Sequence, residues 1–266
     1  MHKLFREVRF SVNPFLGGES VGSNSYAAKP CGEGLGLFFE LCVELTGAVD
    51  GGTGFVVNVT DIDKCVREFV VPVFVERIRG DFGAGRHVSL GGVTQLLRSA
   101  WGRLSGRFEG AVVSKLSLKL NPYRKIAIES EDSVMAYFSE KFEFAAMHKL
   151  WNDAYSEQKN LEVFGKCANP TGHGHNYAIE VTVEVEPGGD GLSIGDFERI
   201  VDDEFIRLVD HKNLNADVAV FSTENPTIEN IAAFAWEKLA GRFGEGKLHC
   251  VTVWETERTC CSYFGP

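Results

Sequence analysis

Apolar and polar positions along the chain repeat one pattern of elements twice. In the first half, alternation with a period of two residues predicts strands at 9–12 and 32–44, and the second half repeats it at 143–146 and 172–184. Apolar positions at helical spacing follow each pair of strands, and two more alternating segments close each half. The predicted order is therefore β-β-α-α-β-β, twice, which indicates an α+β fold made of two tandem domains.

Four helices are predicted from the helical spacing. Asp61 and Asp196 are placed to cap the first helix of each half, and Trp101 and Trp236 lie at matching positions in the second helices. The other apolar positions are Ile62, Cys65, Val66, Phe69, Val93, Leu96, Leu97, Ala100 and Leu104, then Phe197, Ile200, Val201, Phe205, Leu208, Ile228, Ile231, Ala232, Ala235 and Leu239. The closing strands are predicted near 111–120, 123–129, 247–255 and 259–264.

Turn residues and charge divide the chain into the two predicted domains. Asp and Gly at 50–52 and 188–191 predict hairpin turns after the long strands, and the charged segment 129–133 marks a boundary. Residues 1–134 carry 16 basic against 15 acidic side chains, whereas residues 135–266 carry 11 against 22. We therefore predict two antiparallel-sheet domains of different electrostatic character.

Composition excludes several classes of function. A net charge of -10 argues against nucleic acid as a general partner, because duplex binding requires Lys and Arg to neutralise phosphates. No apolar run approaches the roughly 20 residues of a membrane span, and the first residues lack the apolar core of a secretory signal. Seven cysteines without a repeating frame predict free thiols in a reducing compartment, hence a cytoplasmic protein.

Histidines gather in the second half. Residues i and i+2 of a strand project from the same face, so His173 and His175 can present two imidazoles together, and His148 ends the strand that opens this half. Three neutral imidazoles with an open fourth position hold a catalytic zinc. In the first half the matching positions lack histidine: they are Glu33, Leu35 and Asn13-Pro14. Only the second half is therefore predicted to bind zinc in this way.

Cys167 and the pair Asp210-His211 are candidates for proton transfer, and Cys167 is also a candidate nucleophile. Cys167 lies in a segment whose Gly and Pro content predicts a loop, and Lys166 together with a nearby cation would lower the pKa of its thiol. Two alternatives stay open for Cys167: a small apolar residue, or a fourth zinc ligand that makes the site structural. A carboxylate beside an imidazole sets the tautomer and basicity of the ring, although Asp-His pairs also cap helices.

Two carboxylates are further candidates. Glu255 lies in an apolar strand, where an unpartnered charge is costly. It is either a group that binds an amidine-like ring edge or a strand-end carboxylate in solvent. Glu229 begins the second helix of the same half.

Several motifs of the second half occur in the order and at the spacing of one known family. They are Phe144-Ala145-Ala146-Met147-His148, residues 160–170, Gly172-His173-Gly174-His175-Asn176-Tyr177, residues 210–214, residues 226–230 and Glu255-Thr256. Over residues 140–264 the chain resembles the 6-pyruvoyl-tetrahydropterin synthase family, which includes the bacterial 6-carboxy-tetrahydropterin synthases of queuosine synthesis.

The resemblance implies a tunnelling-fold (T-fold) domain, with two helices on one face of its antiparallel sheet, acting on a pterin. The resemblance implies that His148, His173 and His175 bind Zn²⁺ and that Cys167 is the general base. It implies that Asp210 and His211 belong to a catalytic set that is shared across a subunit interface. It also implies that Glu255, Glu229 and Thr227 bind the pterin. The implied lyase reaction removes triphosphate from 7,8-dihydroneopterin triphosphate and gives 6-pyruvoyl-tetrahydropterin. Zinc would act as a Lewis acid, while thiolate and imidazole move protons.

Alternatives to this activity remain at the level of sequence. The same pocket can release acetaldehyde and leave a 6-carboxy pterin, although the six-residue step from Cys167 to His173 favours the pyruvoyl branch. A second alternative is another zinc enzyme on this fold, such as a cyclohydrolase or epimerase. A third is a non-catalytic module that binds a metal or a pterin. Residues 1–134 are interpreted as a degenerate second T-fold copy that serves assembly of a homo-oligomer.

Overall fold

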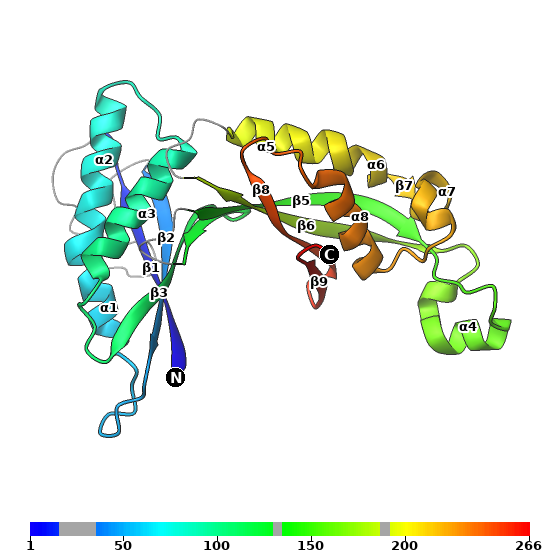
Figure 1. Ribbon diagram of the computed structural model, residues 1–266, viewed down its shortest axis with the longest axis horizontal. Coiled ribbons are helices and arrows are strands. Elements are labelled where there is room, and N and C mark those ends of the chain that lie inside the picture. Colours follow the sequence, from blue (N-terminus) through cyan, green and yellow to red (C-terminus); the bar gives the residue numbers. More distant parts are fainter. Residues whose placement is uncertain (16–35, 130–134, 187–191) are drawn as a thin grey trace. The chain divides into compact units, whose positions relative to one another are not determined.

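The computed structural model describes residues 1–15, 36–129, 135–186 and 192–266. The chain forms two compact units: unit 1 is Met1–Phe138 with Val185–Asp190, and unit 2 is Ser139–Glu184 with Gly191–Pro266. Each unit has helices packed on strands (Figure 1). The predicted glycine-rich start of the first long strand, 32–35, most of the boundary segment 129–133 and most of the turn 188–191 lie outside the described residues.

Unit 1 follows the predicted element order. Its elements are β1 (His2–Val12), β2 (Leu37–Gly47), α1 (Val59–Cys65), η1 (Val66–Val70), α2 (Val71–Gly83), α3 (Leu90–Leu104), β3 (Ala111–Asn121) and β4 (Arg124–Ile128). The strands form an antiparallel sheet in the order β1-β2-β3-β4. Helices α2 and α3 lie against this sheet (Figure 1). The Asp50 turn leads from β2 to α1, so the prediction of a hairpin there is wrong.

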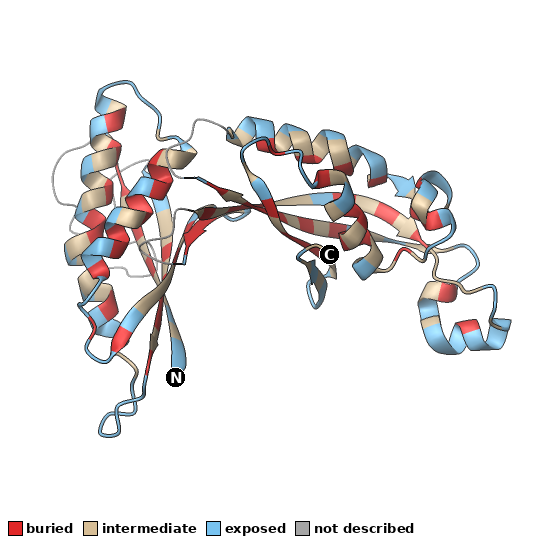
Figure 2. Cartoon of the chain, viewed as in Figure 1, coloured by how far each residue is buried: buried red, intermediate tan, exposed pale blue. Residues whose placement is uncertain are grey.

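The core of unit 1 comes from alternate residues of its strands and one face of its helices (Figure 2). Phe10 of β1 is fully buried, and its ring meets Phe74 of α2 edge-on at 5.2 Å between centroids. Between α1 and α2 the chain makes a π-helical turn, η1, which ends two residues before Pro72 in the first turn of α2. Proline has no N–H to donate within a helix, and such a widened turn accommodates it.

The predicted helix caps are wrong by a few residues in both units. Asn58 caps α1 by accepting a hydrogen bond from the Thr60 N–H, and Ser193 caps α5 (Ile194–Val201) by accepting one from the Asp196 N–H. The predicted caps, Asp61 and Asp196, lie instead in the first turn. A carboxylate is also favourable there, because the N-terminal end of the helix dipole is positive.

Unit 2 carries the same kinds of strand and helix, with additional short elements. Its elements are β5 (Ala136–His148), α4 (Glu157–Phe164), η2 (Gly165–Ala168), β6 (His173–Val185), α5, η3 (Asp202–Ile206), α6 (Arg207–Val209), β7 (Lys212–Asn213), α7 (Leu214–Asp217), η4 (Ala219–Ser222), α8 (Ile228–Leu239), β8 (Lys247–Thr256) and β9 (Thr259–Tyr263). The strand order is β5-β6-β8-β9, and β7 pairs with β5 in parallel. Over the ranges described, each helix is too short or too polar to cross a membrane.

Helix α4 and the 3-10 turn η2 replace the loop predicted around Cys167. The only buried residue of α4 is Asn160, whose side-chain oxygen accepts from the Asn152 N–H at 2.8 Å and whose amide donates to the Asn152 carbonyl at 3.0 Å. A helix held by a buried amide has no apolar stripe, so hydrophobic periodicity does not predict it. In Figure 1, α4 lies beyond the ends of β5 and β6.

Candidate active site

Three histidines converge where β5 ends and β6 begins. His148 is the last residue of β5, and His173 and His175 are the first and third residues of the neighbouring strand β6. Farther into the sheet, Phe144 of β5 stacks on Tyr177 of β6 with ring centroids 5.0 Å apart. Because Phe144 and Tyr177 face the same side as the histidines, this buried aromatic pair sets the alignment of the two strands at the cluster.

The histidine nitrogens are spaced as ligands of one metal ion. Their ligand atoms all lie within 4.8 Å of one another, and His148 Nε2 is 3.3 Å from His173 Nε2. A tetrahedral ion with metal–nitrogen bonds of about 2.0–2.1 Å places its ligands about 3.3–3.4 Å apart. His175 Nε2 is buried without a hydrogen-bond partner in the described part of the chain. Such an orphaned nitrogen is costly, and a metal ion would satisfy it.

The surroundings of His148 hold its ring in the form that a metal requires. His148 Nδ1 lies 2.8 Å from the carbonyl oxygen of Pro226, so this nitrogen donates its hydrogen and Nε2 keeps its lone pair. Burial lowers the pKa of His148, which favours the neutral ring. Burial also lowers the pKa of His175. Two neutral imidazoles at the centre of the cluster are therefore ready to bind a cation.

Cys167 lies beside the histidines and outside the ligand set. Its Sγ is 3.8 Å from His173 Nε2, while the group of mutually close ligand atoms comprises only the three imidazoles over the described residues. Burial raises the pKa of the thiol, and the Glu255 carboxylate raises it further. The prediction that the pKa of Cys167 is lowered is therefore wrong when only the protein's own groups are considered. A bound cation would lower the pKa of this thiol.

Glu255 faces the histidines from β8. Its Oε1 is 3.6 Å from His148 Nε2 and 3.5 Å from His175 Nε2. The pairing of Ala178 with Trp254 holds β8 against β6 at this point. With 22% of its side chain exposed, Glu255 is largely withdrawn from solvent, so the interpretation as a free strand-end carboxylate does not describe it.

Asp210 and His211 form a rigid pair that is held on β5. Asp210 Oδ1 accepts a hydrogen bond from the Ala145 N–H at 2.8 Å, and this bond lowers the pKa of the carboxyl. The other oxygen, Oδ2, is 2.8 Å from His211 Nδ1. The side chain of His211 is 82% exposed and its backbone has a left-handed φ of 56°, which is unusual for a residue other than glycine. The pair is thus positioned firmly with the far edge of its ring in solvent.

Thr227 and Glu229 are placed differently from the histidine cluster. Thr227 is the N-cap of α8, and its hydroxyl accepts a hydrogen bond from the Asn230 N–H. Glu229 is exposed in the first turn of α8, and its electrostatic neighbour is Cys261 of β9. These positions give both residues a local structural setting, and their pterin-binding roles stay predictions.

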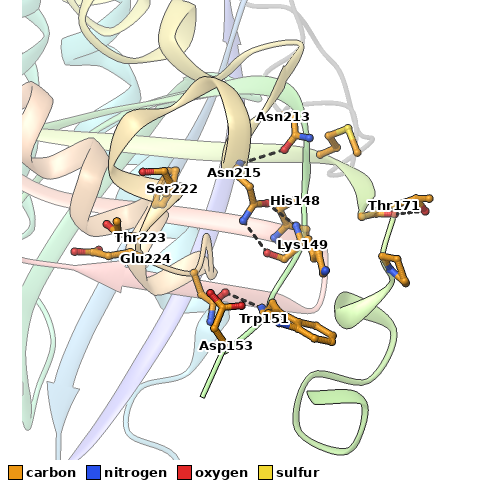
Figure 3. Close-up of a pocket in the computed structure, with 15 residues that line it drawn as sticks. His148, Lys149, Trp151, Asp153, Thr171, Asn213, Asn215, Ser222, Thr223 and Glu224 are labelled. Atoms are coloured by element: carbon orange, nitrogen blue, oxygen red, sulfur yellow. Dashed lines mark hydrogen bonds between the residues drawn. The ribbon is translucent and has the colours of Figure 1, made fainter. Parts of the chain in front are cut away.

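Two cavities border the cluster. One of about 480 Å³ is lined by His175, His211 and Lys212. The other, of about 270 Å³, is lined by His148, Lys149 and polar residues of 213–225. Figure 3 shows Asn215 braced against Lys149: its side-chain oxygen accepts from the Lys149 N–H at 2.7 Å, and its amide donates to the Lys149 carbonyl at 3.0 Å. Because this brace holds the backbone directly after His148, it also positions that imidazole.

Comparisons with known proteins place this half of the chain in a family. A sequence model described as 6-pyruvoyl tetrahydropterin synthase matches residues 137–266. The 6-pyruvoyl tetrahydrobiopterin synthase of Homo sapiens is 38% identical over 133 residues, which cover 49% of this chain and 92% of that protein. The chain belongs to the 6-pyruvoyl tetrahydropterin synthase family. The 6-carboxy-5,6,7,8-tetrahydropterin synthase of Aquifex aeolicus is also similar, at 29% identity over 47% of this chain and 95% of its own length.

A solved structure of the Caenorhabditis elegans 6-pyruvoyl tetrahydropterin synthase is similar as well. It is 32% identical, with a TM-score of 0.46 over 50% of this chain and 96% of that chain. The family model and the human relative show that the second half belongs to this synthase family, and its own strands and helices form a mixed α/β domain with an antiparallel sheet. Of the first-half positions that match the histidines, Glu33 and Leu35 lie outside the described residues, and Asn13 is buried just after β1.

Sequence reasoning missed several residues that position the site of this synthase domain. The hydroxyl of buried Tyr177 is 3.4 Å from His148 Nδ1, beside the Pro226 carbonyl. Asn225 accepts a hydrogen bond from the Trp151 N–H at 2.8 Å and so holds the segment after His148. The period-two pattern through His173 and His175 already points to Tyr177. The backbone carbonyl of Pro226 and the asparagine braces carry no comparable signal.

Gly172 provides a test of how closely β5 and the start of β6 must approach. It has a φ of +69°, and a Cβ there would lie 2.8 Å from the carbonyl oxygen of His148. Gly172→Ala is expected to lower the free energy of unfolding by about 1–3 kcal/mol through overpacking. Left-handed backbone strain at the new alanine should lower it by a further amount of about 1–2 kcal/mol. Gly241→Ala, at φ +73° with nothing within 4 Å, is the matched control for strain alone. Urea unfolding of both variants measures the difference, and equal free energies of unfolding would contradict the close approach.

Proposed function

We propose that this protein is a zinc-dependent lyase that converts 7,8-dihydroneopterin triphosphate into 6-pyruvoyl-tetrahydropterin with release of triphosphate. The observation that carries the proposal is the convergence of three imidazoles beside a half-buried thiol, in a chain similar to 6-pyruvoyl tetrahydrobiopterin synthases. His148, His173 and His175 would hold Zn²⁺ through nitrogens that are already at ligand spacing. When bound, zinc would supply Lewis-acid polarisation of the side-chain oxygens of the substrate.

The chain's own residues would then divide the proton transfers. Cys167, as thiolate, accepts a proton from a carbon of the substrate side chain, at a sulfur that adjoins the metal ligands. His211 exchanges protons with substrate and solvent through its exposed nitrogen, while Asp210 fixes the other ring nitrogen as the donor. Glu255 is the carboxylate nearest the cluster and is suited to accept hydrogen bonds from an amidine-like pterin edge.

The pyruvoyl product is favoured over the carboxy product by the Cys167 segment. His173 is six positions after Cys167; η2 (Gly165–Ala168) contains Cys167, and its thiol lies 3.8 Å from the His173 imidazole. Proteins named as 6-pyruvoyl synthases match at up to 38% identity, against 29% for the 6-carboxy synthase of Aquifex aeolicus.

We assign the chemistry to residues 135–266 and a structural role to residues 1–134, as a degenerate T-fold repeat that supports a homo-oligomer. Two features support the repeat. The strands and helices of unit 1 follow the order β-β-α-α-β-β, and the first long helix of each unit contains a π-helical turn, η1 in one and η3 in the other. A shared interruption within matching helices is an unusual local feature, since π turns are rare.

The proposed reaction is tested by metal content and product mass. The purified protein is expected to contain about one zinc per chain and to convert 7,8-dihydroneopterin triphosphate into a product with the mass of 6-pyruvoyl-tetrahydropterin. Removing zinc with a chelator should abolish turnover, and adding zinc back should restore it. A product with the mass of the 6-carboxy pterin, accompanied by acetaldehyde, would assign the protein to the other branch. Full turnover after complete metal removal would contradict the zinc-dependent reaction.

A further inference from the structure

Glu255 approaches two of the three histidines of the candidate metal centre, and a side-chain rotation would bring its carboxylate to the position of a fourth ligand. Its Oε1 lies 3.6 Å from His148 Nε2 and 3.5 Å from His175 Nε2, close to the about 3.3–3.4 Å that separates ligands around a tetrahedral zinc. We propose that, before substrate binds, Glu255 closes the coordination sphere of the metal held by the three histidines. The proposal rests on the metal centre of the proposed function and adds a state of the site that precedes catalysis.

Backbone pairing, and not a flexible loop, holds Glu255 at this place. It is the residue after Trp254, which pairs with Ala178 of β6, three residues beyond His175. On the other side, Trp254 pairs with Cys260 of β9. Trp254 is paired on both sides, whereas Glu255 lies at an irregularity of the β8–β9 pairing between Trp254 and Thr256. The main chain is therefore fixed directly before Glu255, and its carboxylate needs only a side-chain rotation to approach or leave the ligand position.

Charge favours the same arrangement. Three neutral imidazoles leave the full double positive charge of a zinc ion in a partly buried site, and a buried charge is costly unless an opposite charge accompanies it. Glu255 is the carboxylate that acts electrostatically on His148, His175, Cys167 and Tyr177. A carboxylate oxygen is a regular zinc ligand alongside histidine nitrogen. With 22% of its side chain exposed, it can still be reached by an incoming molecule.

Glu255 cannot bind the metal and the pterin at the same time. A carboxylate oxygen that accepts hydrogen bonds from the pterin edge has less electron density for a metal, and the rotation toward the ring takes it away from the ion. Binding of the pterin ring would therefore draw Glu255 away from the metal position and leave the fourth ligand position free for the side chain of the same substrate. The fourth position would then be open only while a pterin holds Glu255.

Cobalt substitution tests the proposal without relying on turnover. The visible absorption of Co²⁺ reports the number and type of its ligands, and a competing chelating dye reports zinc affinity. Glu255→Gln is expected to weaken zinc binding at least about tenfold and to change the Co²⁺ spectrum. Addition of 7,8-dihydroneopterin to the wild-type Co²⁺ protein should change its spectrum in the same direction. Glu255→Asp, which keeps the charge on a shorter side chain, should give an intermediate affinity.

Glu257→Gln is the matched control, because it removes the same charge from an exposed position in the β8–β9 turn, and it should leave both readouts unchanged. If Glu255→Gln binds zinc with wild-type affinity and an unchanged Co²⁺ spectrum but loses turnover, Glu255 only anchors the pterin. That result overturns the fourth-ligand proposal and leaves the proposed function standing. If the wild-type protein takes up no Co²⁺ or Zn²⁺, the metal centre itself is wrong and both proposals fail.

Discussion

Replacing Cys167 with alanine is expected to lower kcat for 7,8-dihydroneopterin triphosphate by about 10²- to 10⁴-fold, the usual contribution of a positioned general base, while zinc content stays unchanged. The thiol lies 3.8 Å from His173 Nε2, close enough to the metal ligands to reach a substrate held there. It is not one of the three mutually close ligands found within the described ranges. Removing it should therefore abolish proton transfer without opening the metal site.

The measurement combines steady-state kinetics with zinc analysis of the same preparation. Cys260→Ala, which removes an exposed thiol from β9, is the control and should retain wild-type kcat. Loss of zinc from Cys167→Ala would instead show that the sulfur is a ligand, and the alternative of a structural site would replace the proposed base. Wild-type kcat with full zinc would assign the base to another residue.

Mixing two inactive variants is expected to recover activity if each site draws residues from two copies of the chain. Cys167→Ala and His211→Ala should each be nearly inactive as separate proteins. Random assortment in a symmetric oligomer with sites at subunit interfaces should restore about a quarter of the sites. The structural reason is that the His211 side chain is 82% exposed, which leaves it accessible to a neighbouring copy as well as to the cavity that it lines with His175 of its own chain.

The control for this recovery is a mixture of Cys167→Ala with the double variant Cys167→Ala/His211→Ala, which cannot assemble a complete site and should stay inactive. The two proteins carry different affinity tags, so that co-purification demonstrates exchange of subunits. Absence of recovered turnover in a mixture that has exchanged would show that one chain supplies all the catalytic groups, and the shared-site prediction would be wrong.

Hydrophobic periodicity predicted most long elements because strand and helix faces are local properties of the sequence. The predicted strand at 172–184 is β6 (His173–Val185), and the second predicted helix of the same half is α8 (Ile228–Leu239). Elements without an apolar face escaped this reasoning. Helix α4 buries only Asn160, and the two-residue strand β7 is defined by its pairing with β5, which no local pattern encodes.

The candidate site divides in the same way between local and nonlocal information. Alternation along one strand is sufficient to put His173 and His175 on one face. Which side chain approaches them from β8 depends on register, and the pairing of Ala178 with Trp254 brings Glu255 there. The ionisation of Cys167 is a property of its surroundings: burial raises the pKa of the thiol, whereas its sequence neighbour Lys166 led to the opposite expectation.

The amino-acid sequence by itself determined the α+β element order, the family of the second half and the histidines to be considered as ligands, because periodicity and motif spacing are written along the chain. Tertiary structure alone decided that three imidazole nitrogens meet at ligand distance, that the Pro226 carbonyl sets the tautomer of His148, and that Glu255 faces the same point. These are distances between residues up to 107 positions apart. Only the packing of strands and helices against a common core brings such residues together.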